Sequence, residues 1–233
     1  MINVINNLSP NAKIYANCSY LFYRAELDNE SISFSGEVER LIFVASGSLD
    51  LKGHKLTVGD SVELKSKTIE LTGSGIIYVA QSAVALHDPS QLCRITRAGA
   101  HYMVVKPWGF ELWLNRDSQL FCAKRIFIKA GTQTSLQYHN FKEETNLVES
   151  GEVGLVRQAN ASVPIELATE ESTVEDSFTG PICFHIPPKT LHRLRARSDL
   201  WLFEVSTPQL DDVVRVQDDA GRPSGRIEQE HSA

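Results

Sequence analysis

Four polar side chains, carried by two separate stretches of the chain, have the types and spacing of a divalent metal site. Gln137 and His139 stand two positions apart in SLQYH, and Glu144 follows after a short connection. His192 comes much later, in IPPKTLH. Together they offer one amide oxygen, two imidazoles and one carboxylate, a set that suits Zn²⁺, Mn²⁺, Fe²⁺, Co²⁺ or Ni²⁺ and leaves one or two positions open for a substrate. Taken singly, the same residues would be ordinary polar side chains on the surface of a hairpin.

Strands must bring these residues together. Side chains two positions apart on a strand point to the same face, so Gln137 and His139 project together if Leu136 and Tyr138 face the other way. Glu144 is expected to start the next strand, and an antiparallel hairpin would bring it back across from His139. The spacing therefore predicts that one short hairpin carries three of the four candidate ligands.

Residues that favour turns bound both stretches. Gly131 and Gly151 are expected to close the turns at the two ends of the first stretch. Pro187 and Pro188 are expected to make rigid the turn that presents His192. The second stretch is thus predicted to deliver its histidine to the same site from a different strand.

Short alternating or apolar runs, separated by Gly, Asp, Asn, Ser and Pro, dominate the whole sequence. This rhythm is typical of an all-β sandwich or barrel, and no long segment shows a helical period. ERLIFVASGSLDL in the first half resembles ETNLVESGEVGLV in the second. The similarity indicates a duplication into two barrels of about 100 residues each. A single larger sandwich without internal symmetry is the alternative.

The two expected domains differ in their chemistry. Residues 1–98 are predicted to form a first barrel without metal ligands, because His54 and His87 have no carboxylate at a ligand spacing. Residues 99–233 are predicted to form a second barrel, which holds the metal and ends in a polar tail. The stretch 87–100 loses the strand pattern and is interpreted as the connector.

The composition excludes several classes of partner. The chain has 233 residues with 23 basic and 29 acidic side chains, a net charge of −6, which argues against nucleic acid or an anionic membrane as the main partner. No apolar run approaches the roughly 20 residues of a membrane helix. MINVINNLSP has no signal-peptide pattern, so the cytoplasm is the expected location. The four cysteines are widely spaced, which favours reduced, mostly buried thiols.

The metal-site stretches resemble a known superfamily. GTQTSLQYHNFKEETNLVESG resembles the first motif of the cupins, and GPICFHIPPKTLH resembles the second. More narrowly, residues 106–222 resemble the type II mannose-6-phosphate isomerase branch, including the domain fused to GDP-mannose pyrophosphorylases. The shared runs are KPWGFELWL, KRIFIKAGTQTSLQYH, IPPKTLHRL and LFEVSTPQLDDVVRVQDDAGR. The resemblance implies two tandem cupin barrels, which are double-stranded β-helices of the jelly-roll type.

The resemblance also implies roles for particular residues. The implied metal ligands are Gln137, His139, Glu144 and His192. A glutamine in the first ligand position fits this branch and speaks against a three-histidine dioxygenase. Arg215 and Arg222 stand at positions expected to bind phosphate or to assist isomerisation.

This chain departs from the pattern of that branch near the expected mouth of the barrel. Asn140 and Phe141 replace imidazoles, Lys189 stands where a turn glycine is expected, and Ala220 stands where a tyrosine usually precedes GR. These changes keep the metal set and alter the lining of the pocket. Residues 1–98 are also too short for a pyrophosphorylase domain and carry no Gly-rich nucleotide loop.

The expected activity is aldose–ketose isomerisation or epimerisation of a sugar or sugar phosphate, by abstraction of a proton next to a carbonyl group. The candidates for the base are Glu144, Lys124 and His185, although a histidine satisfied within the barrel is the preferred interpretation of His185. Basic residues that could line a phosphate site are Lys106, Lys124, Arg193, Arg195 and Arg215.

Two other functions fit the same residues. The first is a non-catalytic sugar-binding or regulatory cupin whose altered mouth has lost isomerisation. The second is a metal-dependent oxygenase or lyase that acts on a small acid. Neither nucleic acid nor a membrane is an expected partner, and a homodimer is possible because cupins commonly pair through strand edges.

Overall fold

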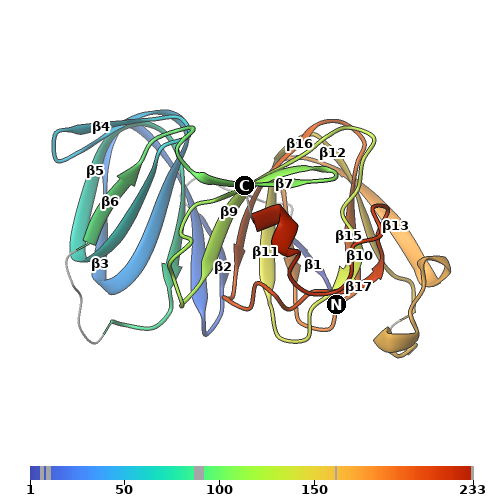
Figure 1. The fold of residues 1–233 in the computed structure, drawn as a ribbon. Helices are drawn as coiled ribbons and strands as arrows, with labels where there is room; N and C mark the ends of the chain where they lie inside the picture. The colour runs from blue at the N-terminus through green and yellow to red at the C-terminus, as the bar shows by residue number, and fades with distance from the viewer. Residues whose placement is uncertain (6–7, 9–11, 87–91, 161, 232–233) are drawn as a thin grey trace. The chain divides into compact units, whose positions relative to one another are not determined.

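Antiparallel β-strands make up about 60% of the described chain, and the predicted all-β class is confirmed (Figure 1). The computed structural model describes residues 1–5, 8, 12–86, 92–160 and 162–231, so His87 lies outside the described residues. Within these ranges the only helices are three short 3-10 helices. None of the helices in the described ranges is long and apolar enough to cross a membrane.

The strands group into two compact units, and neither unit is one continuous stretch of chain. The N-terminal unit comprises Leu8–Tyr102 and Leu114–Ala123. The C-terminal unit comprises Met1–Asn7, Met103–Trp113 and Lys124–Ala233. The first residues of the chain therefore belong to the same unit as its second half. The predicted division near residue 98 did not include this exchange.

Two long, bent strands dominate the N-terminal unit. β3 (Tyr20–Leu51) pairs along its length with β5 (Ser61–Ser82), and Arg40 of β3 lies opposite both Leu64 and Gln81 of β5. The two strands therefore curl around a shared core of Leu, Ile and Val side chains. The shorter strands of this unit are β2 (Ala12–Ala16), β4 (His54–Thr57) and β6 (Leu92–Thr96).

Two sheets that face each other form the C-terminal unit (Figure 1). The first sheet has the strand order β1-β14-β11-β16-β9-β8-β7, and the second has the order β13-β12-β15-β10-β17. The strands of the first sheet are β1 (Asn3–Ile5), β7 (Tyr102–Lys106), β8 (Gly109–Trp113), β9 (Cys122–Ile128), β11 (Glu144–Ser150), β14 (Ile182–Ile186) and β16 (Leu200–Ser206). The strands of the second are β10 (Leu136–Tyr138), β12 (Glu152–Gln158), β13 (Thr173–Thr179), β15 (His192–Ala196) and β17 (Val214–Gln217), and the 3-10 helices are η1 (Ile165–Leu167), η2 (Glu170–Ser172) and η3 (Glu228–His231).

Apolar side chains from both sheets pack against each other inside this unit. Val148, Phe184 and Leu202 of the first sheet belong to the same buried cluster as Val153 and Leu155 of the second. Burial of such side chains contributes about 1.5 to 3 kcal/mol each, which holds the two sheets together. The polar site described below lies between the same two sheets and depends on this packing for its position.

The turns at the ends of the first motif form as predicted. Gly131 has φ +76° and Gly151 has φ +102°, values in the region that favours glycine. At Gly151 a Cβ atom would also lie 2.4 Å from the carbonyl oxygen of Asp199. No other residue could therefore take the place of Gly151 without moving the backbone of the turn that joins β11 to β12.

The four cysteines are all free thiols. Cys122 and Cys183 are buried in strands of the first sheet, as predicted, whereas Cys18 and Cys93 are exposed. Cys18 lies in the bend before β3, and Cys93 lies on the edge strand β6, whose first three residues are all exposed. The prediction of mostly buried thiols is therefore right for two of the four positions.

Candidate metal centre

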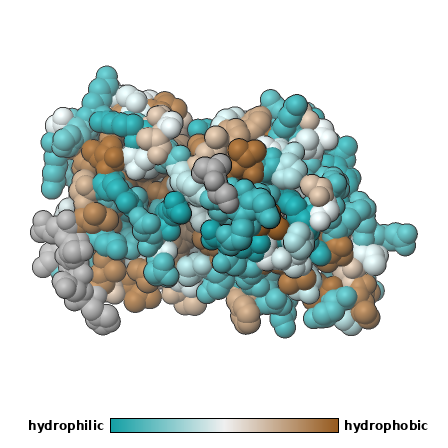
Figure 2. Space-filling view, in the orientation of Figure 1, coloured by the Kyte–Doolittle hydropathy of each residue, from teal (hydrophilic) through white to brown (hydrophobic). Residues whose placement is uncertain are grey.

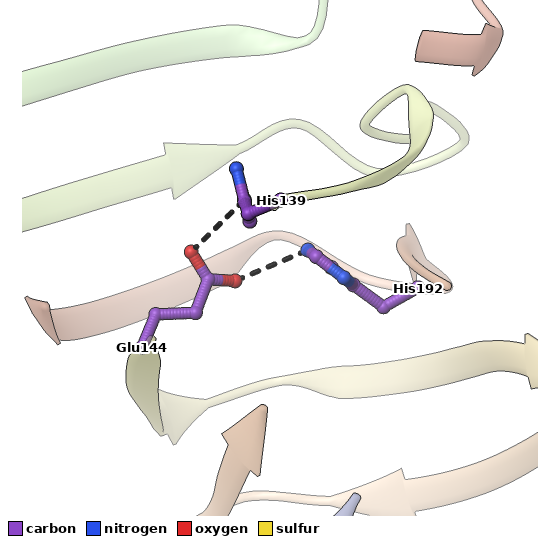
Figure 3. Close-up of side chains that lie close together, drawn as sticks. All are labelled: His139, Glu144 and His192. Carbon is purple, nitrogen blue, oxygen red and sulfur yellow. Dashed lines mark ion pairs between the residues drawn. The ribbon is translucent and has the colours of Figure 1, made fainter. Parts of the chain in front are cut away.

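Three possible metal ligands lie close together between the two sheets of the C-terminal unit (Figure 3). His139 directly follows β10, Glu144 is the first residue of β11, and His192 is the first residue of β15. The Nε2 atoms of His139 and His192 lie 3.6 and 3.1 Å from the two carboxylate oxygens of Glu144. One ligand atom from each residue fits within a group no more than 4.8 Å across, and all three side chains are buried.

Glu144 reaches His139 by a route that differs from the predicted hairpin. β10 pairs with β15 and β17 in the second sheet, whereas β11 pairs with β14 and β16 in the first. Residues 140–143 therefore cross from one sheet to the other, and Glu144 faces His139 across the interior. The hairpin prediction was wrong because a short connection can join strands of two packed sheets as well as neighbours in one sheet.

Backbone carbonyl groups fix the same tautomer in both histidines. His139 donates from Nδ1 to the carbonyl oxygen of Asp212, and His192 donates from Nδ1 to the carbonyl oxygen of Thr190 over 2.9 Å. A carbonyl oxygen can only accept, so the proton of each neutral ring sits on Nδ1. Each Nε2 therefore carries a lone pair and points toward Glu144. This is the arrangement that metal-binding histidines adopt.

The donor set fits a cation. Neither Nε2 atom makes a hydrogen bond of normal geometry, although both are buried. Burial, together with the neighbouring Lys142 ammonium, lowers the pKa of His139, so that this ring is neutral at physiological pH. Lone pairs on nitrogen then face lone pairs on the carboxylate, and a positive ion between them would turn this repulsion into attraction. The geometry and chemistry of these residues match a site for a divalent metal.

A buried lysine forms an ion pair with Glu144. Lys142 forms ion pairs with Glu144 Oε2 and, over 3.0 Å, with Glu204 Oε1. Asn146 Nδ2 donates to Glu144 Oε1 over 3.2 Å. Burial alone would raise the pKa of Glu144, but the Lys142 ammonium holds it well below its usual range. Glu144 is therefore an anion at neutral pH.

Gln137 lies beside the three ligands with its side chain on the predicted face. It is paired in register with His192 and lines the same cavity, whereas Leu136 and Tyr138 pack into an apolar cluster on the other face of β10. The predicted alternation of β10 is thus correct. Ser135 Oγ donates to Gln137 Oε1 over 2.7 Å, which orients the amide. Its role as a fourth ligand stays a prediction.

One cavity of about 110 Å³ contains these residues and most of the other residues predicted for the site. The further predicted residues that line it are Lys106, Lys124, Arg215 and Arg222. They come from β7, β9, and β17 with the segment directly after it, so three distant parts of the chain converge on one space. The sequence prediction of a single site is consistent with this placement.

Three other predicted residues do not line the cavity. His185 lies 3.1 Å from Thr145 Oγ1 and 3.1 Å from Glu143 Oε1. Arg193 is fully buried and bonds to Thr134 and Gln217. These side chains project from the other faces of their strands, because neighbours such as Ile186, His192 and Leu194 take the inward positions.

Arg195 is the third of these residues. Its guanidinium group donates to Gln133 Oε1 and Glu175 Oε2, over 2.8 and 2.6 Å. It shares the outward face of β15 with Arg193, since the two residues are two positions apart. The structure therefore does not bring the candidates Arg193 and Arg195 to the cavity. His185 also lies away from it and contacts Thr145 and Glu143, which agrees with the preferred interpretation of a histidine satisfied within the barrel.

A carboxylate that the sequence did not single out organises the cationic end of the cavity. Glu111 Oε2 lies 3.1 Å from Lys124 Nζ and accepts a hydrogen bond from Trp113 Nε1 over 2.9 Å, and Glu111 Oε1 lies 3.7 Å from Lys106 Nζ. Burial would raise the pKa of Glu111, but Lys124 and Lys106 lower it to about 2. The ammonium group of Lys124 also lies over the Trp113 ring, 4.6 Å from its centroid.

Solved structures share this architecture. The oxalate decarboxylase of Lactobacillus farciminis matches 86% of this chain and 80% of its own chain with a TM-score of 0.61 at 10% identity. The 11S globulin of Wrightia tinctoria matches 82% of this chain and 75% of its own with a TM-score of 0.57 at 12% identity. The chain has the cupin fold. At these identities the likeness concerns the fold alone.

Curated relatives resemble part of this chain in sequence. The xanthan biosynthesis protein XanB of Xanthomonas campestris pv. campestris is 32% identical over 127 residues, which are 52% of this chain and 24% of XanB. The alginate biosynthesis protein AlgA of Pseudomonas putida is 30% identical over 138 residues, 57% of this chain and 25% of AlgA. The chain thus spans about a quarter of the length of these relatives. No protein-family model matches it.

Asp212 is a second residue of this site that the sequence analysis did not single out. Its carboxylate accepts hydrogen bonds from the backbone N–H groups of Asn140, Phe141 and Lys142, over 3.1, 2.5 and 3.0 Å. These bonds fix the connection between His139 and Glu144. The signal was present in the DDVVR run, whose second aspartate is Asp212, but nothing in the sequence tells which distant backbone it caps.

Proposed function

We propose that the C-terminal unit binds one divalent metal ion and acts on a sugar or sugar phosphate as an aldose–ketose isomerase or epimerase. His139, Glu144 and His192 would hold the ion, with Gln137 as the further ligand. The observation that carries the proposal is the pair of Nε2 lone pairs that face one buried carboxylate without a hydrogen-bond donor between them. A metal bound there would polarise the oxygens of the substrate.

Two likenesses support a carbohydrate substrate. XanB and AlgA are named as proteins of xanthan and alginate biosynthesis, respectively. The runs shared with type II mannose-6-phosphate isomerases include those that carry Gln137, His139 and His192. A shared metal set favours shared chemistry, although function is decided by the site and not by the fold.

Residues that line the cavity could transfer the proton that isomerisation requires. The reaction moves a proton between neighbouring carbons and their oxygens, so it needs a proton donor and acceptor beside the substrate. Lys124 lines the cavity and is held by Glu111 and Trp113, which favours it over His185 for this role. Glu144 stays a second candidate from its position between the histidines.

Arg215 and Arg222 would bind the charged end of a sugar phosphate. Arg215 uses Nη1 to donate to the carbonyl oxygens of Pro223 and Gly225, while its buried Nε has no hydrogen-bond partner. Arg222 is held by Asp218, 2.7 Å away. A guanidinium that is already oriented loses little conformational entropy when it binds phosphate oxygens.

Metal content per chain tests the proposal first. Wild type and the variants His139→Ala and His192→Ala are purified without chelator and measured by mass spectrometry. The exposed His54 gives the matched control, His54→Ala. About one equivalent in wild type and His54→Ala, with loss in both site variants while folding is intact, is the expected result.

Turnover is tested on the metal-loaded protein with a panel of aldose and ketose phosphates followed by NMR. Interconversion of one pair, lost in Lys124→Met, would support the isomerase. Thermal stabilisation by a sugar without turnover would instead favour a non-catalytic binding protein. Consumption of oxygen with Fe²⁺ would favour an oxygenase. Absence of metal after incubation with Zn²⁺, Mn²⁺ and Fe²⁺ would contradict the metal site itself.

A further inference from the structure

The last 3-10 helix places a carboxylate inside the cavity. Glu230 of η3 is about nine-tenths buried, with Oε2 at 2.8 Å from Lys106 Nζ and Oε1 at 3.0 Å from Arg222 Nη1. Both cationic side chains are equally buried. Each oxygen of Glu230 thus meets one cation, which is how a bound carboxylate or phosphate group meets a receptor built for it.

The segment around Glu230 forms part of the wall of the cavity. Gly225, Ile227 and His231 line it together with Trp113, and the His231 ring meets the Trp113 ring edge-on at 5.3 Å between centroids. In Figure 1 the short red helix η3 is drawn in front of β11, and in the same view the surface there is mostly hydrophilic (Figure 2). Such a polar segment, held largely by ion pairs, separates more easily than a packed apolar one.

The charges that ion pairs join to Glu230 balance only while it is present. Three cations and three carboxylates are joined by ion pairs into one cluster, and its members are Lys106, Lys124, Arg222, Glu111, Asp218 and Glu230. Without Glu230 the cluster would keep three cations and two carboxylates. The remaining positive charge would be buried beside the cavity, and a buried charge calls for a counter-ion.

From this geometry we infer that Lys106 and Arg222 form a subsite for an anionic group of the ligand, a phosphate or a carboxylate, and that Glu230 occupies it until such a ligand displaces it. The inference rests on the proposed function for the rest of the ligand, because it names the part of a sugar phosphate or sugar acid that would bind at this end. Displacement of Glu230 would also enlarge a cavity of about 110 Å³, which is small beside the 300 Å³ or more of most ligand pockets.

The variant Glu230→Gln tests whether the charge of Glu230 competes with an anionic ligand for Lys106 and Arg222. The substitution keeps the size of the side chain and removes its charge, so Lys106 and Arg222 remain without their shared anion. Glu228→Gln is the matched control, because Glu228 lies in the same 3-10 helix but is exposed and pairs with Arg226. Binding of inorganic phosphate and, separately, of succinate is measured by calorimetry on chelator-treated protein at constant ionic strength.

Glu230→Gln is expected to bind at least one of the two anions about tenfold more tightly than wild type, while Glu228→Gln matches wild type. Adding Lys106→Gln to Glu230→Gln should abolish the gain. Gain with phosphate alone would indicate a phosphorylated ligand, and gain with succinate alone a carboxylate.

An unchanged affinity for both anions would overturn the inference, as would a gain that survives Lys106→Gln. A purely structural Glu230 would lower the melting temperature on substitution without any gain in anion binding. The measurement needs neither metal nor turnover, so its outcome is independent of whether the protein proves to be a metal-dependent isomerase.

Discussion

The backbone carbonyl oxygen of Asp212 accepts the Nδ1 proton of His139, and the carboxylate of the same Asp212 binds the three backbone N–H groups that follow His139. One residue therefore sets both the tautomer of a candidate ligand and the path of the chain to the next one. Burial would raise the pKa of Asp212, but the N–H groups of Lys142, Phe141 and Asn140 lower it, so the cap is an anion.

Asp212→Asn should therefore weaken metal binding without touching a ligand. The amide keeps the shape but loses the charge that favours three N–H donors, so the connection between His139 and Glu144 is held less firmly. A decrease of about tenfold in affinity is expected, the usual effect of removing a residue that orients a metal ligand. Zn²⁺ titration with a competing chelator measures it. Asp211→Asn, at an exposed neighbour, is the control, and equal affinities in the two variants would refute this role.

Lys142→Met should be strongly destabilising in metal-free protein. It leaves the buried carboxylates of Glu144 and Glu204 without their shared cation, and loss of one partner of a buried ion pair costs about 3 to 5 kcal/mol. Urea unfolding with chelator gives the free energy. Because a divalent ion would replace the missing positive charge at Glu144, added metal should stabilise Lys142→Met more than wild type. Lys129→Met, at an exposed position, should have no such effect.

Lys189→Gly should stabilise the protein. Lys189 has φ +54°, and its N–H donates to the carbonyl oxygen of His139 over 2.6 Å. The left-handed conformation costs a residue with a Cβ atom about 1 to 2 kcal/mol, and glycine avoids this cost. Part of the gain in stability is lost because glycine has more conformational freedom in the unfolded chain. A net gain of about 1 kcal/mol is expected in thermal or urea unfolding. Thr190→Gly is the control, since its φ is negative and the substitution should destabilise.

The stability of the metal-free protein should fall as the pH drops below about 6.5, the usual pKa of histidine. Burial lowers the pKa values of His139 and His185, so these histidines bind protons more weakly in the folded chain than in the unfolded chain. Stability from these residues is therefore complete above the unfolded pKa and is lost as the pH falls toward the folded one.

Tryptophan fluorescence can follow this effect, because all three tryptophans lie in the C-terminal unit. His185→Gln should reduce the pH dependence of the free energy of unfolding by up to about 1.4 kcal/mol per pH unit. His54→Gln, in the N-terminal unit, should leave it unchanged. An equal slope in wild type and His185→Gln would show that this histidine does not contribute.

Local pattern was enough to predict the inner part of the site. The alternation of Leu136, Gln137 and Tyr138 places Gln137 on the inner face, and Glu144 begins a strand as expected. The glycines at the ends of the motif predicted its turns. These features depend on neighbours in sequence, and such neighbours are visible in the sequence.

Contacts between distant residues could not be predicted in the same way. Lys142 meets Glu204 because β11 and β16 pair in one particular register, and Glu230 enters the cavity only because the segment after β17 turns back. The alternation in HRLRAR was visible, but whether its basic residues face the cavity or the outside was not. Arg193 and Arg195 lie on the face of β15 that points away from the cavity, because His192 and Leu194 occupy the face that points toward it.

The strand β1 has a consequence for how the protein is made. Asn3, Val4 and Ile5 pair with His185, Phe184 and Cys183 of β14, which in turn pairs with the strand that begins at Glu144. On the ribosome β1 emerges well before β14, its partner strand among the described residues. β1 therefore lacks this partner until β14 has been synthesised, and the sheet that carries Glu144 can be completed only then.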